Sequence, residues 1–235
     1  IRSYYGEVNR IERPRQGSLQ KLTLQAVLWT VDGLDGRLQS RDDWLSLVLV
    51  SRHNDQVMVA VDNYVEGLDT PFALPGGIVV RAGRHEFVRW TADLQTAQAR
   101  HFSLHWKLIC CDYYDGRSTE SDLQLAWHPS AHFNATFRHQ LQPITLPTGH
   151  TSIHIESLAA TVNVSPDMKL ASELQYDNVS RRFAASLRYR WEFQPTSELL
   201  VTLGESAALQ GVVPHGTYHS QATAFAVRVG HRFQY

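Results

Sequence analysis

The chain lacks the features that stabilise disulfide scaffolds or hold structural metals. Its only two cysteines among 235 residues are Cys110 and Cys111, which are adjacent. Neighbouring side chains of an extended strand point to opposite faces, so a mutual disulfide is geometrically poor and the spacing suits no metal site. We therefore expect neither a disulfide framework nor a cysteine-bound metal.

An excess of one charge and long apolar runs are also missing. Lys plus Arg number 22 against 23 Asp plus Glu, which disfavours nucleic acid or another polyanion as a partner. No apolar run approaches the roughly 18 residues of a membrane helix, so helical membrane proteins are excluded but membrane strands are not. The chain opens without Met or a charged and apolar leader, and we expect it to be a piece of a longer product.

The feature that is present from end to end is alternation of apolar and polar residues with a period of two. In residues 183–193 one face carries Phe183, Leu187, Tyr189 and Trp191, and the other carries charged and small residues. This pattern predicts an all-β chain. Thirteen strands are expected near residues 3–12, 19–31, 37–50, 56–67, 84–96, 101–114, 118–128, 131–141, 152–165, 168–178, 182–194, 197–205 and 219–235, and all nine prolines fall between them.

The expected connections alternate between short turns and longer links, the latter at residues 68–83, 142–151 and 206–218. Outer-membrane barrels have short turns on one side and longer loops on the other. The first long link carries Phe72, Leu74, Ile78 and Val79, which we expect to be exposed. Three roles are open for this link: it forms a constriction inside the barrel, it contacts a partner, or it packs over the barrel mouth.

Alternation alone does not distinguish a soluble sandwich from a membrane barrel. Thirteen strands exceed the seven to nine of a common sandwich, and several aromatic residues stand near strand ends, as in an interfacial girdle. The C-terminal strand resembles the signal that the outer-membrane assembly machinery reads. Its residues are Phe225, Val227, Val229, Phe233 and Tyr235.

These features predict an antiparallel transmembrane β-barrel of the bacterial outer membrane, with about 12–14 strands in this chain and one domain over residues 1–235. The apolar faces are then lipid-facing. Their predicted members are Val88, Trp90, Leu94, Phe102, Leu104, Trp106, Phe183, Leu187, Tyr189 and Trp191.

Three blocks, residues 71–90, 111–133 and 165–203, resemble a known family of bacterial outer-membrane proteins of unknown function. The resemblance is to their C-terminal barrel, and the N-terminal half of such proteins is a periplasmic module similar to carbohydrate-binding family 9. It implies further strands upstream of this chain. A complete barrel has an even strand number, so either upstream strands are absent here or the first of the thirteen segments is not a membrane strand.

The polar faces would line the barrel lumen. The predicted lumen-lining residues are Arg89, Asp93, His105, Lys107, Glu173, Arg188, Arg190, Glu192, Arg228 and Arg232. Asp93 with His105, and Glu173 with Arg188, are expected to be near cross-strand neighbours. One interpretation is an ion-pair network that stiffens the wall; the other is an arginine surplus on the last strands that favours anions or orients sugars.

No constellation predicts catalysis, a metal or a cofactor. His128 with His132, and His150 with His154, are four apart, but they flank turns and lack supporting ligands. No GxSxG elbow occurs. The expected function is a pore or uptake channel, for oligosaccharides or other small solutes. The alternatives are a structural anchor without transport and a soluble β-sandwich binding module. Expected partners are outer-membrane lipid and lipopolysaccharide, the barrel assembly machinery, and a periplasmic sugar-binding module or other subunits.

Overall fold

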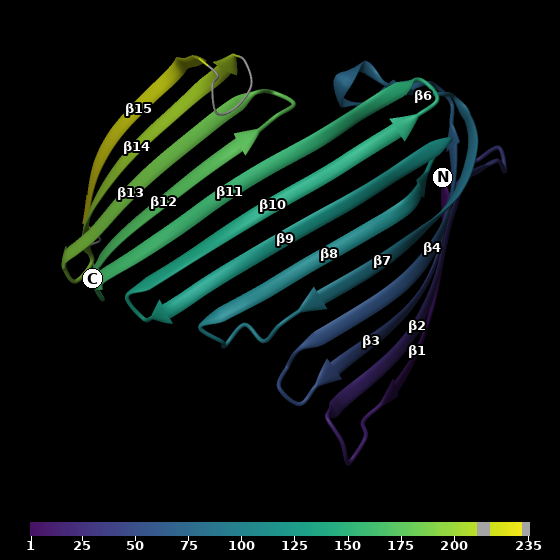
Figure 1. The fold of residues 1–235 in the computed structure, drawn as a ribbon, viewed down its shortest axis with the longest axis horizontal. Helices are drawn as coiled ribbons and strands as arrows, with labels where there is room; N and C mark the ends of the chain where they lie inside the picture. Colours follow the sequence, from purple (N-terminus) through teal and green to yellow (C-terminus); the bar gives the residue numbers. More distant parts are fainter. Residues whose placement is uncertain (211–216, 232–235) are drawn as a thin grey trace. The chain divides into compact units, whose positions relative to one another are not determined.

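The computed structural model describes residues 1–210 and 217–231, and these form an all-β, antiparallel fold (Figure 1). Thirteen strands make one sheet in which almost every strand pairs with its neighbours along the chain, and two short strands make a second sheet. The expected all-β class, the antiparallel pairing and the thirteen strands are confirmed. No helix among the described residues is long and apolar enough to cross a membrane.

The strands of the large sheet follow chain order, with β5 and β6 set apart in the small sheet. Their bounds are β1 Arg2–Glu12, β2 Leu19–Asp32, β3 Leu38–Ser51, β4 Gln56–Leu68, β5 Phe72–Ala73, β6 Val79–Val80, β7 Gly83–Gln95, β8 Phe102–Tyr113, β9 Gly116–Ser130, β10 Phe133–Leu146, β11 Gly149–Ser165, β12 Met168–Asp177, β13 Arg182–Gln194, β14 Ser197–Gln210 and β15 Thr217–His231; a 3₁₀ turn, η1, spans Pro75–Gly77.

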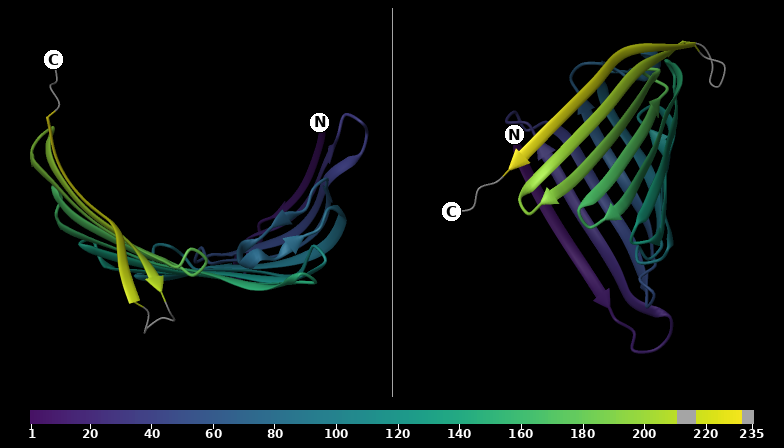
Figure 2. Two further views of the ribbon diagram at one scale, coloured as in Figure 1. Left: turned by 90° about the horizontal axis from the view of Figure 1, so that it is seen from above. Right: turned by 90° about the vertical axis from the view of Figure 1, so that its left-hand side faces the viewer.

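Residue contacts divide the chain into two compact units. Unit 1 comprises Ile1–Gln98, Leu104–Leu123 and Gln140–Ile153, and unit 2 comprises Ala99–Ser103, Gln124–His139 and His154–Tyr235. Within unit 2, strands β12 to β15 run side by side in both views of Figure 2. The expectation that residues 1–235 form one barrel domain stays a prediction.

Cross-strand register sorts the side chains into two faces, because directly opposite residues of an antiparallel pair share a face. In unit 2, Leu187 stands opposite Leu203, which stands opposite Phe225. In unit 1, Arg89 stands opposite Asp62 on one side and Cys111 on the other. The period-two sequence pattern therefore becomes one apolar and one polar face in each unit.

The link between β4 and β7 folds onto the polar face of unit 1 and makes its main core. Ile78 and Val80 are buried there against Ile144 and Leu146 of β10. At Gly76, whose φ is 81°, an added Cβ would lie 2.6 Å from Thr151 Oγ1 of β11. Only glycine combines this backbone conformation with so close an approach. The expectation of an exposed Ile78 is wrong, since 3% of the residue is accessible.

Three other expectations are corrected. Residues 142–151 are not a long link, because β10 and β11 extend to a two-residue turn at Pro147 and Thr148. Pro129 and Pro143 accordingly lie inside β9 and β10; both stand within a few residues of a strand end, where a missing ladder hydrogen bond costs least. The expected alternation of short and long connections is thus weaker than the sequence indicated.

Three further expectations concern the first strand, the two cysteines and the last of the expected long links. β1 pairs with β2 along its whole length, so the first of the thirteen segments is a strand of the same sheet. Cys110 and Cys111 are bonded to one another, contrary to the expectation from an extended strand. The stretch 206–218 is mostly strand, up to Gln210 and again from Thr217.

Candidate functional site: the polar face of the sheet

No helix or strand of residues 1–210 and 217–231 forms a second layer on the apolar faces. None of the ten residues predicted to face lipid is buried, and 56% of Trp90 and 37% of Leu187 are accessible. On β15, Phe225, Val227 and Val229 are exposed on the same face, opposite Leu203, Val201 and Leu199. Phe233 and Tyr235, from the predicted assembly signal, and the predicted lumen residue Arg232 lie outside the described residues. Contact of this face with lipid stays a prediction.

Four predicted polar-face residues meet in unit 1. Asp93 stands directly opposite Lys107 in the β7–β8 ladder, and Arg89 lies on the same face four residues away. His105 Nε2 lies 3.0 Å from Asp93 Oδ2, so the expected neighbour relation is confirmed. These side chains form a charged row along two adjacent strands.

A cluster of carboxylates that the sequence analysis missed stands beside this row. Asp62 is buried and stands opposite Arg89 in the β4–β7 ladder, and Asp42 lies on the same face of the neighbouring strand β3. The Oδ1 atoms of both aspartates, and Nε and Nη2 of Arg89, are buried without a hydrogen-bond partner. The face thus holds unused acceptors and donors side by side.

Aromatic rings line the same face between the carboxylates and the folded link. Tyr64 stacks on Phe87 at 5.3 Å, and the guanidinium of Arg89 lies 5.4 Å from the ring centre of Tyr113. Tyr114, in the β8–β9 turn, contacts Phe87 at 5.1 Å. Burial, together with a hydrogen bond to Glu66, raises the pKa of the Tyr114 hydroxyl above its ordinary value. Tyr114 therefore stays a neutral donor.

The polar face of unit 2 has a different construction. Glu198 accepts from Arg190 Nε at 3.0 Å and from Arg228 Nη2 at 2.5 Å, while Arg190 also reaches Glu192 at 3.2 Å. These groups are substantially exposed and border a cavity of about 410 Å³, lined by Arg190, Glu192, Glu198, Thr196, Gly230 and His231. Two arginines of the predicted surplus, Arg190 and Arg228, are therefore paired with carboxylates.

The second predicted pair has the same register relation as Asp93 with His105. Glu173 stands opposite Ser186, and Arg188 stands opposite Ala171, so the two charges are near neighbours offset by one step on the same face. The neighbour relation is therefore confirmed, but no ion pair joins the two side chains within the part of the chain that the structure describes.

Two signals would have revealed the missed residues. In the segment 56–67, Asp62 lies on the same face of the strand as Gln56 and Glu66. A carboxylate in the middle of the segment indicates that this is the polar face. Glu198 stands directly opposite Glu192 across the Pro195 and Thr196 turn. If Pro195 and Thr196 are taken as a two-residue turn, Glu198 falls on the same face as the predicted arginines.

The apolar face of unit 2 has one polar interruption. Glu205 stands between Ala185 and Thr223 and accepts hydrogen bonds from the hydroxyls of Tyr218, Ser220 and Thr223, all on β15. Beside it lies a groove of about 320 Å³ lined mainly by apolar side chains. Three hydroxyl donors satisfy both oxygens of a carboxylate that faces away from the polar side.

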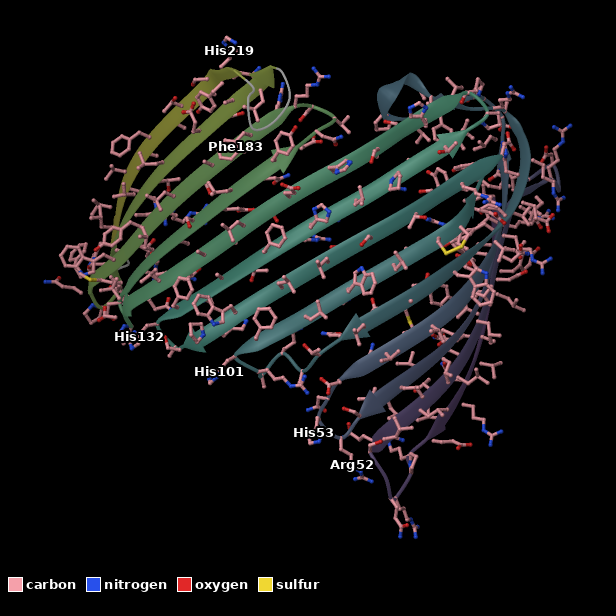
Figure 3. All side chains as sticks on the ribbon, viewed as in Figure 1. Arg52, His53, His101, His132, Phe183 and His219 are labelled. Atoms are coloured by element: carbon pink, nitrogen blue, oxygen red, sulfur yellow. A yellow bond between two sulfur atoms is a disulfide. The ribbon has the colours of Figure 1, made fainter. Side chains whose placement is uncertain are left out.

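Histidines do not gather into a metal site in the described ranges. His101 and His132 lie at strand ends (Figure 3), and His132 Nδ1 contacts the carbonyl of Asn163 at 2.9 Å. Across residues 1–210 and 217–231, no group of three or more His, Cys, Asp or Glu side chains is arranged to hold a metal ion.

Comparison with known proteins does not assign the chain to a family. No family model and no curated protein matches it. The chain is similar to a solved structure titled as a NanC porin in a rhombohedral crystal form, at 10% identity and a TM-score of 0.35, over 83% of this chain and 94% of that chain. A similarity this remote carries no functional argument. The resemblance to the family with a carbohydrate-binding-like module stays a prediction.

Proposed function

We propose that the chain forms the wall of a transmembrane β-barrel pore in a bacterial outer membrane, with its apolar face in lipid and its polar face toward water. The observation that carries the proposal is the uncovered apolar face. Trp90 in unit 1, and Leu187 and Phe225 in unit 2, are exposed on the apolar faces of their own units.

A single-layer sheet with such a face needs a cover. Burying one large apolar side chain contributes about 1.5–3 kcal/mol, and soluble domains obtain this by packing a second layer against the sheet. Among residues 1–210 and 217–231 no helix or strand provides that layer. Hydrocarbon or another protein must therefore supply it.

Lipid fits the dimensions and the ends of the apolar face. The strands of the large sheet run from 10 to 17 residues, against the ~9–11 that a tilted membrane strand needs. On β3 the apolar residues Leu45, Leu47 and Leu49 share a face with Arg41 and Asp43. These two residues come before them in the strand and form an ion pair. A charged pair at the end of an apolar stripe is typical of a membrane boundary.

The polar face supports passage of small polar solutes such as oligosaccharides. Arg190, Glu198 and Arg228 offer accessible donors and acceptors beside an open cavity in unit 2, and aromatic rings line the polar face of unit 1. Mixed donors and acceptors exchange hydrogen bonds with hydroxyl groups without selecting one charge sign.

A structural anchor is the second candidate, and one observation favours it. The link 69–82 covers part of the polar face of unit 1, with Ile78 and Val80 buried. If this packing and the ion pairs close the lumen, the protein holds an assembly in the membrane without conducting. Lipopolysaccharide, the barrel assembly machinery and a sugar-binding module are the partners proposed for either role.

Partition and conductance test the two candidates separately. We expect the protein to fractionate with detergent-extracted outer membranes, and a pore to give discrete current steps after reconstitution into planar bilayers. Folded, membrane-inserted protein without current would support the anchor. Recovery in the soluble fraction would refute both candidates and favour a soluble binding module.

A further inference from the structure

His85 stands where the covering link 69–82 meets the sheet. It belongs to β7, and only 5% of the residue is accessible. Its Nδ1 lies 2.9 Å from Asp115 Oδ1 in the β8–β9 turn, and its Nε2 lies 2.8 Å from the carbonyl oxygen of Arg81 in the link. The ring therefore joins the link to a turn of the sheet.

Both partners of the ring are acceptors. A backbone carbonyl has no hydrogen to donate, and a carboxylate such as that of Asp115, whose side chain is 44% accessible, only accepts. Neutral imidazole carries one N–H, whereas the imidazolium carries two. Only the imidazolium makes both contacts, and loss of a proton leaves a nitrogen lone pair facing an oxygen.

Acidic, aromatic and basic groups stand around the ring. Glu66 of β4 stands directly opposite His85 in the β4–β7 ladder, and Asp115 approaches from the turn. Tyr114 places its ring edge against the imidazole at 5.3 Å and bonds Glu66. The cationic groups nearest in the chain are Arg81 in the link and Arg84 in β7, and Arg84 lies near Glu86 at 3.9 Å.

From this donor count we infer that His85 is a proton-dependent latch, which holds the link 69–82 on the polar face while it is protonated and loosens it when the proton leaves. Histidine is the side chain that ordinarily changes charge between about pH 5 and pH 8. The apolar contacts of Ile78 and Val80 oppose release, so the latch shifts the population of the open link rather than melting the fold.

The latch is a property of the link and does not depend on the proposed pore. Where the polar face does line a pore, release of the link uncovers the face that carries Asp62 and Arg89. The same pH change would then raise conductance. Current and link position are separate readouts, so a failed pore leaves the latch testable and a rigid link leaves the pore testable.

Thiol labelling of a cysteine in the link measures its release. Val80→Cys places a thiol of nearly the same size at a buried position of the link. Leu34→Cys, in the β2–β3 turn of the same unit, is 76% accessible and corrects for the pH dependence of thiol chemistry. Cys110 and Cys111 are bonded to each other, and the unsubstituted chain gives the background. We expect the ratio of the two labelling rates to rise about tenfold or more between about pH 5 and about pH 9.

Asp115→Asn is the matched variant. Its amide donates to a neutral Nδ1, which frees Nε2–H for the Arg81 carbonyl, so the link should stay protected at both pH values. The site lies in an exposed turn, which favours normal folding. Should that variant misfold, His85→Gln should instead give high labelling at both pH values. A flat ratio in the parent, or an unchanged rise in Asp115→Asn, would overturn the latch.

Discussion

The polar faces of the two units differ in whether their charged side chains are buried or accessible. In unit 1, Asp62 and His85 are buried, aromatic rings pack on the same face, and the link 69–82 covers part of it. In unit 2, Arg190, Glu198 and Arg228 pair with one another while remaining accessible. The same sequence pattern, alternation with charges on one side, underlies both.

This difference indicates that the covering link, rather than the strand pattern, decides whether a charged side chain of the polar face is buried in the fold or accessible to solutes. Buried polar groups cost free energy when they are left without partners, so substitutions around the link should matter most. Exposed ion pairs contribute little to stability.

The largest effect is expected in the core under the link. Ile78→Ala removes a side chain packed on Ile144 and Leu146, and we expect a loss of about 2–5 kcal/mol in the free energy of unfolding. Leu34→Ala, in an exposed turn of the same unit, serves as the control and should change little. Chemical denaturation of the reconstituted protein measures both, and equal losses would show that the link is not a core.

The apolar face of unit 2 should be nearly as sensitive. Leu187→Arg places a charge in the proposed lipid layer, with an expected cost of ~2–4 kcal/mol near mid-bilayer, whereas Ser186→Arg on the polar face should be mild. Refolding into bilayers across a denaturant series compares the pair. Similar costs for the two neighbours would contradict the assignment of faces.

A smaller effect should separate two adjacent glycines in the link. Gly76 and Gly77 both have positive φ, so alanine strains each by about 1–2 kcal/mol. Only at Gly76 does the new Cβ also meet Thr151, while the space around Gly77 is open. Gly76→Ala should therefore destabilise more than Gly77→Ala in thermal unfolding, and the reverse order would argue against the docked link.

The smallest effect on stability is expected in unit 2. Glu198→Gln removes the carboxylate that Arg190 and Arg228 share, but all three side chains meet solvent. We expect unchanged unfolding and, in a conducting pore, a shift of reversal potential toward anions under a salt gradient. A large loss of stability would place this network among the structural ones.

The strands were predictable because the signal for them is local. Residues 182–194 were predicted and observed as one strand, and ten residues of β12 match the expected 168–178 closely. The error at 142–151 arose from treating Pro143 as a break, although Gln140, Gln142 and Ile144 continue the alternation on one face. A proline near a strand end does not terminate pairing.

The candidate site was only partly predictable, for a physical reason. The pair of Asp93 with His105 depends on one short connection and was found from the sequence. The burial of Ile78 depends on Ile144, 66 residues later, and no local pattern encodes so distant a contact. Asp62 acquires its role from Arg89 and Asp42 on the two flanking strands, which requires the register.

Fluorescence quenching by brominated acyl chains tests most directly which side of the sheet meets hydrocarbon. Trp90 and Trp106 lie on the apolar face, and Trp44, opposite Asp62, lies on the polar face. In single-tryptophan variants reconstituted into bilayers, strong quenching of Trp90 and Trp106 with little quenching of Trp44 is the predicted result. Equal quenching at all three positions, or quenching of Trp44 alone, would contradict it.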